Sequence, residues 1–252
     1  MPIAMNPVTV MHRGRTLRGT HYGKADAEPV VIAHGFSDSR IGPGRLIVDL
    51  ARTLAGSGFA VWAFDRAGHG ESDGSLADVS VPDEIEQLAA MLALVGGHPH
   101  LIGHSLGGME LATLAGRMPD AVATLTLMAP AAASADDVRQ GRVLGRPVDP
   151  LKSGQSIDID GQALGAAFVE GMAGYDPYAG LDAFAGPVFL HHGLDDAVVA
   201  PAYSQRYAET FPNAHLTHYA GADHSWAALG PRRTLINTCV RQLASARRPV
   251  TG

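Results

Sequence analysis

One serine of this chain stands in a pattern that can hold a nucleophile. Residues 103–107 read Gly-His-Ser-Leu-Gly, and they lie between a short apolar run and a stretch of helical periodicity. A serine between two glycines at a strand-to-helix turn is held on a tight, exposed turn, where its hydroxyl can attack a carbonyl carbon. Gly103 and Gly107 suit such a turn because a Cβ at either position would crowd the neighbouring backbone. We therefore predict Ser105 as the nucleophile of an acyl-transfer reaction.

The base and the acid that such a serine needs follow later in the chain. A serine hydroxyl is a poor nucleophile at neutral pH, and a histidine that is oriented by a carboxylate activates it. His224 follows the predicted strand 215–219, and Asp195 and Asp196 follow an earlier predicted strand. Serine, acid and histidine occur in this chain order when each stands at the carboxyl end of a different parallel strand. The sequence thus predicts a catalytic triad of Ser105, His224 and one of the two aspartates.

The other histidines do not fit the position of a base. Those that precede the serine or fall inside a strand are His12, His21, His34, His215 and His218. His104 neighbours the serine and is expected to point elsewhere. The vicinal pair His191 and His192 lacks the ligand spacing of a known metal motif, so we predict no metal site.

Two backbone amides are predicted to stabilise the negative charge that develops on the substrate oxygen. The residue after the nucleophile, Leu106, supplies one amide, and the loop after the predicted strand 30–33 supplies the other. In that loop, Gly35 permits a close turn that would direct the amide of Phe36 toward the serine. Residues 65–72 are also glycine-spaced, but they lack the Lys-Ser/Thr ending of a phosphate-binding loop, so we predict a structural turn there.

Alternating strands and helices are predicted to position these groups. Residues 8–11 and 17–21 flank a polar turn and predict an antiparallel hairpin. Short apolar runs predict strands covered on both faces, at 30–33, 60–64, 100–102, 123–128, 188–190 and 215–219. Helical periodicity is clearest at 85–95, where Ser80 and Asp83 form a predicted capping pair, and looser at 46–54, 109–115, 203–207 and 235–243. These units predict an α/β fold with a mostly parallel central sheet and helices on both faces.

The regular alternation stops between residues 131 and 186. This segment is rich in Ala, Gly, Asp and Pro, and it is far longer than a usual loop between a helix and a strand. We predict that residues 131–186 form a small inserted cap on a core made of residues 1–130 and 187–252. Long insertions at the carboxyl ends of parallel strands lie where ligands bind. Three cap residues are therefore predicted to face the substrate: Asp137, Tyr175 and Tyr178.

The composition of the chain argues against several classes of protein. The 252 residues carry a formal charge of −6 without a run of Lys or Arg, so nucleic-acid binding has little support. No apolar run reaches the length of a membrane span, and the N-terminus has no signal-peptide pattern. We therefore expect a cytoplasmic protein that binds neither nucleic acid nor membrane, and a homodimer is one assembly that the sequence allows. The single cysteine, Cys239, excludes a disulfide framework.

Five motifs together resemble those of a known superfamily. In chain order they are HGF at 34–36, DRAGHGESDG at 65–74, GHSLGG at 103–108, HHGLDDAVV at 191–199 and GADHSW at 221–226. This set is similar to that of the α/β-hydrolases and, within them, to that of the bacterial cinnamoyl (feruloyl) esterases. The resemblance implies an α/β-hydrolase fold and hydrolysis of small ester substrates through an acyl-enzyme, without a cofactor.

The resemblance also bears on the choice of acid. In this superfamily the acid commonly stands three residues after a glycine and just before a pair of valines, which favours Asp196 over Asp195. Some members carry their acid at the place of Asp136 and Asp137. Because these two aspartates lie several residues beyond the preceding strand, we expect them to line the site instead.

Further resemblance concerns the acyl pocket. In the cinnamoyl esterases, an acid and a tyrosine of the cap contact the phenolic hydroxyl of the substrate. Asp137 matches the acid, whereas Phe168 stands where the tyrosine is expected, and Trp226 is assigned to the same site. The superfamily also contains thioesterases, lactonases, peptidases and carbon-carbon bond hydrolases, so the fold alone does not choose the reaction. The alternative to an enzyme is a non-catalytic ligand receptor that has the hydrolase fold.

Overall fold

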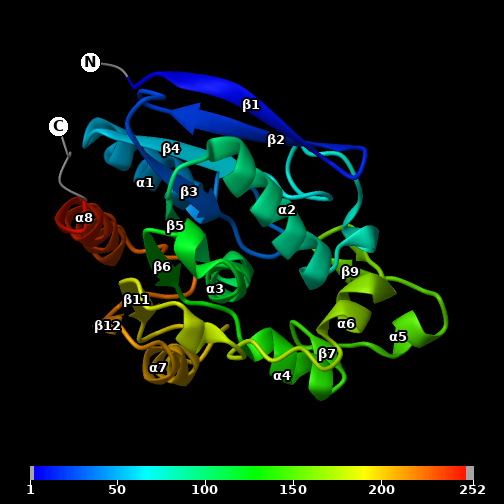
Figure 1. Ribbon diagram of the computed structural model, residues 1–252. Helices are drawn as coiled ribbons and strands as arrows, with labels where there is room; N and C mark the ends of the chain where they lie inside the picture. The colour runs from blue at the N-terminus through cyan, green and yellow to red at the C-terminus, as the bar shows by residue number, and fades with distance from the viewer. Residues whose placement is uncertain (1–2, 248–252) are drawn as a thin grey trace.

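An eight-stranded sheet forms the centre of the protein in the computed structural model (Figure 1). The structure describes residues 3–247, so residues 1–2 and 248–252 of the predicted core lie outside it. The spatial order of the strands is β1-β2-β4-β3-β5-β6-β11-β12. Their bounds are β1 Met5–His12, β2 Arg15–Tyr22, β3 Glu28–Ala33, β4 Phe59–Phe64, β5 His100–His104, β6 Thr124–Met128, β11 Val188–Gly193 and β12 Ala214–Tyr219.

The direction of the strands follows from their pairing. Strand β2 pairs antiparallel with both β1 and β4, whereas all other neighbours in this sheet pair in parallel. Strands β5 and β6 are buried along their whole length, whereas edge strand β1 is exposed at its start and alternates between exposed and half-buried residues from Pro7 onward. This burial matches the near-continuous apolar runs of the central strands, which helices cover on both faces. The predicted hairpin and mostly parallel sheet are confirmed.

Helices cover the two faces of the sheet and create two separate cores. On one face lie α1 (Leu46–Gly56) and α8 (Leu229–Ser245), and the buried Cys239 belongs to the core beneath them. On the other face lie α2 (Val81–Val95), α3 (Leu106–Arg117) and α7 (Pro201–Thr210) (Figure 1). None of the helices in residues 3–247 combines the length and the apolar character that crossing a membrane requires.

Residues 131–186 connect β6 to β11 and contain short elements only. They are α4 Ala133–Arg139, β7 Arg142–Val143, β8 Arg146–Pro147, α5 Asp149–Lys152, β9 Ile157–Ile159, β10 Gln162–Leu164 and α6 Ala166–Met172. Strands β7–β8 and β9–β10 form two small antiparallel hairpins. Apolar residues of this segment, among them Leu164, Phe168 and Met172, belong to the same core as α2 and α3. The segment is therefore packed on that side of the molecule.

Short 3-10 helices join some of these elements. Their bounds are η1 Pro43–Arg45, η2 Leu76–Asp78, η3 Pro119–Ala121 and η4 Leu181–Ala183. Residues 131–186 contact one of them, because β10 and α6 both lie against η2.

The start of α2 differs from the prediction. Ser80 is the N-cap residue, but its side chain makes no capping hydrogen bond. Asp83 instead accepts hydrogen bonds from Arg13 (2.8 Å) and Arg15 (2.6 Å) of the β1–β2 hairpin. Two guanidinium groups attract this carboxylate more strongly than a single backbone amide does. The predicted capping pair is thus wrong, and Asp83 fastens the hairpin to the helix.

Candidate active site

Ser105 lies on a sharp turn between β5 and α3. Its backbone has φ 54° and ψ −121°, and it is half-buried. A Cβ at Gly103 would stand 2.5 Å from the Cα of Gly108, and a Cβ at Gly107 would stand 2.2 Å from the carbonyl oxygen of His34. The prediction that glycines are needed beside the serine is confirmed, because no side chain fits in these spaces. A non-glycine residue at positive φ is strained, and such strain is found at functional turns.

Three side chains from distant parts of the chain form a continuous hydrogen-bonded row. The hydroxyl of Ser105 and Nε2 of His224 are 2.9 Å apart, and Nδ1 of His224 lies 2.7 Å from Oδ2 of Asp196. His224 comes from the loop after β12, and Asp196 comes from the loop after β11. Asp195 is exposed, whereas Asp196 is buried. The geometry therefore places Asp196 and not Asp195 against the histidine.

Asp196 is held by four donors. Oδ1 accepts hydrogen bonds from the backbone amides of Val198 and Val199, each at 2.8 Å. Oδ2 lies 2.7 Å from Nδ1 of His224 and 3.2 Å from Nε2 of His192. Burial raises the pKa of this carboxyl, but the hydrogen bonds from His192 and His224 outweigh burial and hold the pKa below its ordinary value. Asp196 is therefore an ionised acceptor that fixes the orientation of the imidazole.

His192 also supports the carboxylate of Asp196, and the sequence did not predict this role of His192. Its Nε2 lies 2.9 Å from the carbonyl oxygen of Val199, and its Nδ1 lies 2.6 Å from the hydroxyl of Ser204. The neighbouring His191 points to the opposite side, where its Nδ1 meets the hydroxyl of Tyr219 at 2.8 Å. The two rings alternate across β11, as adjacent residues of a strand do. In the described part of the chain, no cluster of three or more His, Cys, Asp or Glu side chains could hold a metal ion.

His104 lies against His224. Its ring centroid is 5.2 Å from that of His224, and its Nε2 is 2.9 Å from the backbone carbonyl oxygen of His224. Burial, together with the nearby His224, lowers the pKa of His104 to about 4, so the ring is neutral at pH 7 and its Nε2–H donates. We expected His104 to point elsewhere. It instead anchors the loop that carries His224.

The buried histidines predict a loss of stability in acid. Burial is the main cause that lowers the pKa of His104 and of His191 to about 4. In the unfolded chain they titrate near 6.5, so below that pH the unfolded state binds more protons and the free energy of unfolding falls. Glu110 opposes this trend, because burial raises its pKa well above the ordinary value. We expect a net loss on the order of 2 kcal/mol between pH 6.5 and 5.

Urea unfolding at several pH values between 7 and 5 measures this loss. His104→Gln should flatten the pH dependence, and the same change at the exposed His98 serves as the matched control. A free energy of unfolding that stays constant from pH 7 to 5 would show that the buried rings are not the source of acid lability.

The two predicted oxyanion donors lie beside the serine. Phe36, Ser105 and Leu106 all line the same pocket. Neither the amide of Phe36 nor that of Leu106 donates to a protein acceptor among residues 3–247. A Cβ at Gly35 would stand 3.2 Å from the Cβ of Ser105, so the glycine lets this loop approach the serine. Both amides are thus free for a substrate oxygen.

The glycine-spaced segment 65–72 is the turn that its sequence predicts. The buried carboxylate of Asp65 accepts hydrogen bonds from the backbone amides of Arg40 (2.6 Å) and Glu71 (2.9 Å). A Cβ at Gly70 would overlap that carboxylate at 2.2 Å. The glycines of this segment therefore make room for a buried acid that closes the turn.

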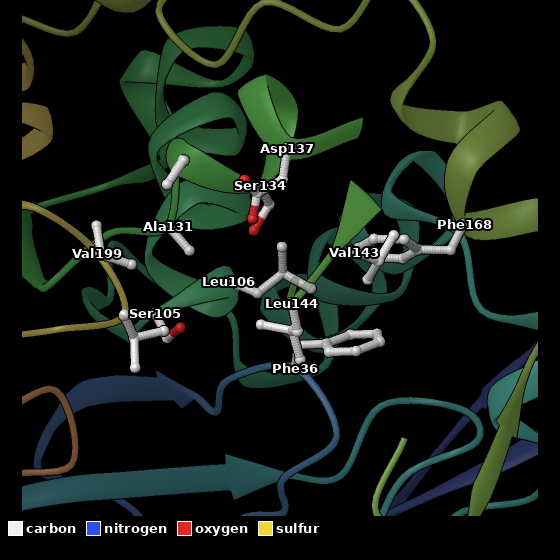
Figure 2. Close-up of a pocket in the computed structure, with 12 residues that line it drawn as sticks. Phe36, Ser105, Leu106, Ala131, Ser134, Asp137, Val143, Leu144, Phe168 and Val199 are labelled. Carbon is white, nitrogen blue, oxygen red and sulfur yellow. The ribbon is translucent and has the colours of Figure 1, made fainter. Parts of the chain in front are cut away.

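A pocket opens in front of the serine (Figure 2). In this view Ser105 lies at one end and Phe168 at the other, and Ser134 and Asp137 lie together on one wall. The rings of Phe36 and Phe168 pack with their centroids 4.7 Å apart. The remaining lining residues are Leu106, Ala131, Ala133, Val143, Leu144, Val198 and Val199. The pocket is thus mainly apolar, with two polar side chains from α4, as small-molecule sites commonly are.

Three residues assigned to the substrate lie elsewhere. The hydroxyl of Tyr175 hydrogen-bonds Thr113 on α3, and Tyr178 packs against Tyr207 with ring centroids 4.7 Å apart. Trp226 is fully buried in the core under α1 and α8. None of the three lines the pocket. This corrects the expectation for Tyr175, Tyr178 and Trp226: burying a large aromatic ring against the core is more favourable than leaving it at a polar entrance.

Two other aspartates, the alternative acid Asp136 and Asp223 beside His224, are engaged in other contacts. Asp136 pairs with Arg139 and accepts a hydrogen bond from the hydroxyl of Tyr203 at 2.7 Å. Asp223 accepts a hydrogen bond from the amide of Ala227 at 2.8 Å. Neither carboxylate reaches His224, so the choice of Asp196 has no competitor among them.

Comparison with known proteins gives a consistent result. A family model described as alpha/beta hydrolase fold matches residues 28–150. The structure is similar to that of Est1E from Butyrivibrio proteoclasticus with bound ferulic acid, with a TM-score of 0.87, 22% identity and coverage of 95% of this chain and 98% of that chain. It is also similar to a monoacylglycerol lipase from Paleococcus ferrophilus, with a TM-score of 0.70, 22% identity and coverage of 98% and 100% of the two chains.

A curated relative is similar in sequence. The monoacylglycerol lipase of Mycolicibacterium smegmatis is 26% identical over 238 residues, which cover 79% of this chain and 82% of the lipase. Esterase and lipase names thus recur among the proteins that resemble this chain in structure or in sequence.

Proposed function

The chain has the α/β-hydrolase fold, and on that premise we propose that it is a serine hydrolase that cleaves small carboxylic esters through an acyl-enzyme. One observation carries the proposal: the row of hydrogen bonds from Ser105 through His224 to Asp196, which ends at a pocket with two free backbone amides. Esterase and lipase relatives support ester hydrolysis as the reaction.

The geometry leads to a two-stage mechanism. His224 accepts the proton of the Ser105 hydroxyl while the oxygen attacks the ester carbonyl. The amides of Phe36 and Leu106 donate to the oxyanion of the tetrahedral intermediate, and ionised Asp196 stabilises the imidazolium that forms. His224 then protonates the leaving alcohol, and an acyl group remains on the serine. Water, activated by the same imidazole, releases the carboxylic acid.

The pocket walls indicate which acyl groups fit. The rings of Phe36 and Phe168, tilted by 40° to each other, form an apolar surface with Val143 and Leu144 that suits a flat or short acyl group. Asp137 lies on the α4 wall and can accept a hydrogen bond from a polar group on the acyl moiety. These features support small and aromatic esters of the cinnamoyl type, and the ferulic acid complex of Est1E agrees with such a substrate.

The function is tested with 4-nitrophenyl and methyl esters of increasing acyl size, from acetyl to cinnamoyl and dodecanoyl. We expect turnover of the smaller acyl and the cinnamoyl esters. A folded protein that hydrolyses none of them would contradict the proposal.

Phe168→Tyr tests the role of the distal wall. The new hydroxyl would face the far end of the acyl pocket, where a phenolic group can share a hydrogen bond with it. We expect kcat/KM for a 4-hydroxycinnamoyl ester to rise by about 5- to 10-fold, since a hydrogen bond contributes about 1 kcal/mol. The unsubstituted cinnamoyl ester is the matched control and should not gain. An equal change for both esters would show that Phe168 does not contact this end of the acyl group.

A further inference from the structure

A buried cluster of charged groups lies beneath the oxyanion loop, and the mechanism above does not use it. Arg66 follows β4, Glu84 lies on α2 and Glu110 lies on α3, and all three are 0% exposed. Nε of Arg66 lies 2.6 Å from Glu84 and 3.4 Å from Glu110. Burying three ionisable groups together is costly, so their arrangement calls for a physical reason.

The guanidinium of Arg66 also binds the backbone of the oxyanion loop. Nη1 donates to the carbonyl oxygen of His34 at 3.0 Å, and Nη2 donates to that of Gly35 at 3.3 Å. The ring of His34 helps, because its Nδ1 lies 2.7 Å from the carbonyl oxygen of Gly35 while its Nε2 accepts the amide of Arg66 at 3.1 Å. Two donors thus fix the Gly35 carbonyl from the protein interior.

The carbonyl of Gly35 shares its peptide plane with the amide of Phe36. Within residues 3–247 every peptide bond is trans, and in a planar trans peptide the C=O and N–H point in opposite directions. When Arg66 and His34 hold the C=O inward, the N–H of Phe36 must turn outward, on the side where Phe36 and Ser105 line the pocket. Arg66 therefore controls the direction of the predicted oxyanion donor.

Charge balance in the cluster requires one additional proton. One guanidinium and two ionised carboxylates would leave a net negative charge in a site that water does not reach. Oε2 of Glu84 and both oxygens of Glu110 accept no hydrogen bond from a donor elsewhere in the described chain, yet the two carboxyl groups are within hydrogen-bonding reach of each other. Two ionised carboxylates cannot bond in this way, whereas a protonated one can donate to the other.

The proton belongs on Glu110. Burial, reinforced by the neighbouring Glu84, raises the pKa of Glu110 well above its ordinary value despite the charge of Arg66. Burial acts in the same sense on Glu84, but the adjacent guanidinium of Arg66 outweighs it, and the pKa of that carboxyl is lowered. His69, with Nδ1 3.7 Å from Glu84, stays neutral because burial lowers its own pKa. The cluster then contains one cation, one anion and one neutral acid.

We infer that Arg66 is a positioning residue for the oxyanion hole: paired with ionised Glu84 and with Glu110 kept as a neutral acid, it locks the Gly35–Phe36 peptide so that the Phe36 amide faces the reacting carbonyl. This inference rests on the proposed hydrolase function for its catalytic part. The protonation of Glu110 is independent of that function.

Kinetics test the catalytic part. Arg66→Lys keeps the charge but loses the planar fork that reaches two carbonyls, so we expect kcat to fall by about 10- to 100-fold with KM nearly unchanged, as for a weakened oxyanion donor. Glu110→Gln is the matched control, and kcat should stay within about twofold because the amide resembles a neutral acid in size and donors. If Arg66→Lys does not fold, the double variant Arg66→Met, Glu84→Gln takes its place in the test. It removes the two opposite charges together and should show the same loss of kcat.

Infrared spectroscopy tests the proton without any substrate. Wild type at pH 7 should show the C=O band of a buried neutral carboxylic acid, and Glu110→Gln should lack it. The inference is overturned if folded Arg66→Lys keeps the kcat of wild type, if Glu110→Gln loses as much activity as Arg66→Lys, or if the acid band is absent from wild type. Because the band does not require turnover, a failure of the proposed function and a failure of this inference give different results.

Discussion

Replacing Ser105 with alanine is expected to lower kcat for a 4-nitrophenyl ester by about 10⁴- to 10⁶-fold, as loss of the nucleophile does in enzymes with a Ser-His-Asp triad. The reason is that the hydroxyl 2.9 Å from Nε2 of His224 is the only group in this row that can form the acyl-enzyme. The remaining rate comes from the oxyanion donors and from substrate binding. Steady-state kinetics of the purified variant measure the effect.

The matched control for this variant is Ser225→Ala. Ser225 lies next to His224 in the same loop, and its side chain makes no hydrogen bond within residues 3–247. It should keep nearly the activity of wild type. Thermal unfolding followed by circular dichroism checks that both variants are folded. A folded Ser105→Ala protein with activity close to that of wild type would remove the serine from the mechanism.

Asp196→Asn is expected to lower kcat by about 10³- to 10⁴-fold. The amide keeps the size of the side chain but removes the charge that stabilises the imidazolium of His224. Its NH2 group also cannot accept from Nδ1, so the histidine is driven toward the tautomer that cannot take the serine proton. The measurement is kcat on the same activated ester, with the pH kept constant.

Asp195→Asn provides the comparison. The two aspartates are adjacent, but Asp195 is exposed and Asp196 is buried against His224. We expect little change at Asp195. If Asp195→Asn lost more activity than Asp196→Asn, the role of the acid would move to Asp195.

The fold could be predicted well because its signals are local. Apolar runs of three to six residues between helical stretches placed the ends of the central strands to within three residues, and the parallel order followed from their alternation with helices. The capping pair at α2 could not be predicted, since Asp83 meets Arg13 and Arg15 from a hairpin that lies far away in sequence.

The row of catalytic candidates could also be located from the sequence. Ser105 was marked by its glycines and His224 by its place after a strand, and the spacing of the superfamily favoured Asp196. The structure brings these three side chains together, and the predictions above test their roles.

The residues that support this row could not be predicted. His104 and His192 act through contacts with partners that lie 120 and 4 residues away, and nothing in the sequence distinguishes them from other buried histidines. The motif containing Arg66 predicted a turn, but its contacts with Glu84 and Glu110 depend on how α2 and α3 pack. The sequence alone therefore does not predict which buried charged side chains will contact one another.

Residues 131–186 show a second limit of prediction from the sequence. Asp137 and Phe168 lie at the pocket as expected, whereas Tyr175 and Tyr178 face the α3 and α7 side. The short elements of residues 131–186 have little periodicity, so the sequence does not indicate which aromatic side chains turn toward the substrate and which turn toward the core.

The central claim is that Ser105 is the nucleophile, and covalent labelling tests it most directly. The protein is incubated with an activated fluorophosphonate, digested, and the modified peptide is identified by mass spectrometry. We expect one label, on the peptide that contains Ser105, and we expect Ser105→Ala to lack it. A stoichiometric label on another residue, or ester hydrolysis that continues in wild type without labelling of Ser105, would contradict the claim.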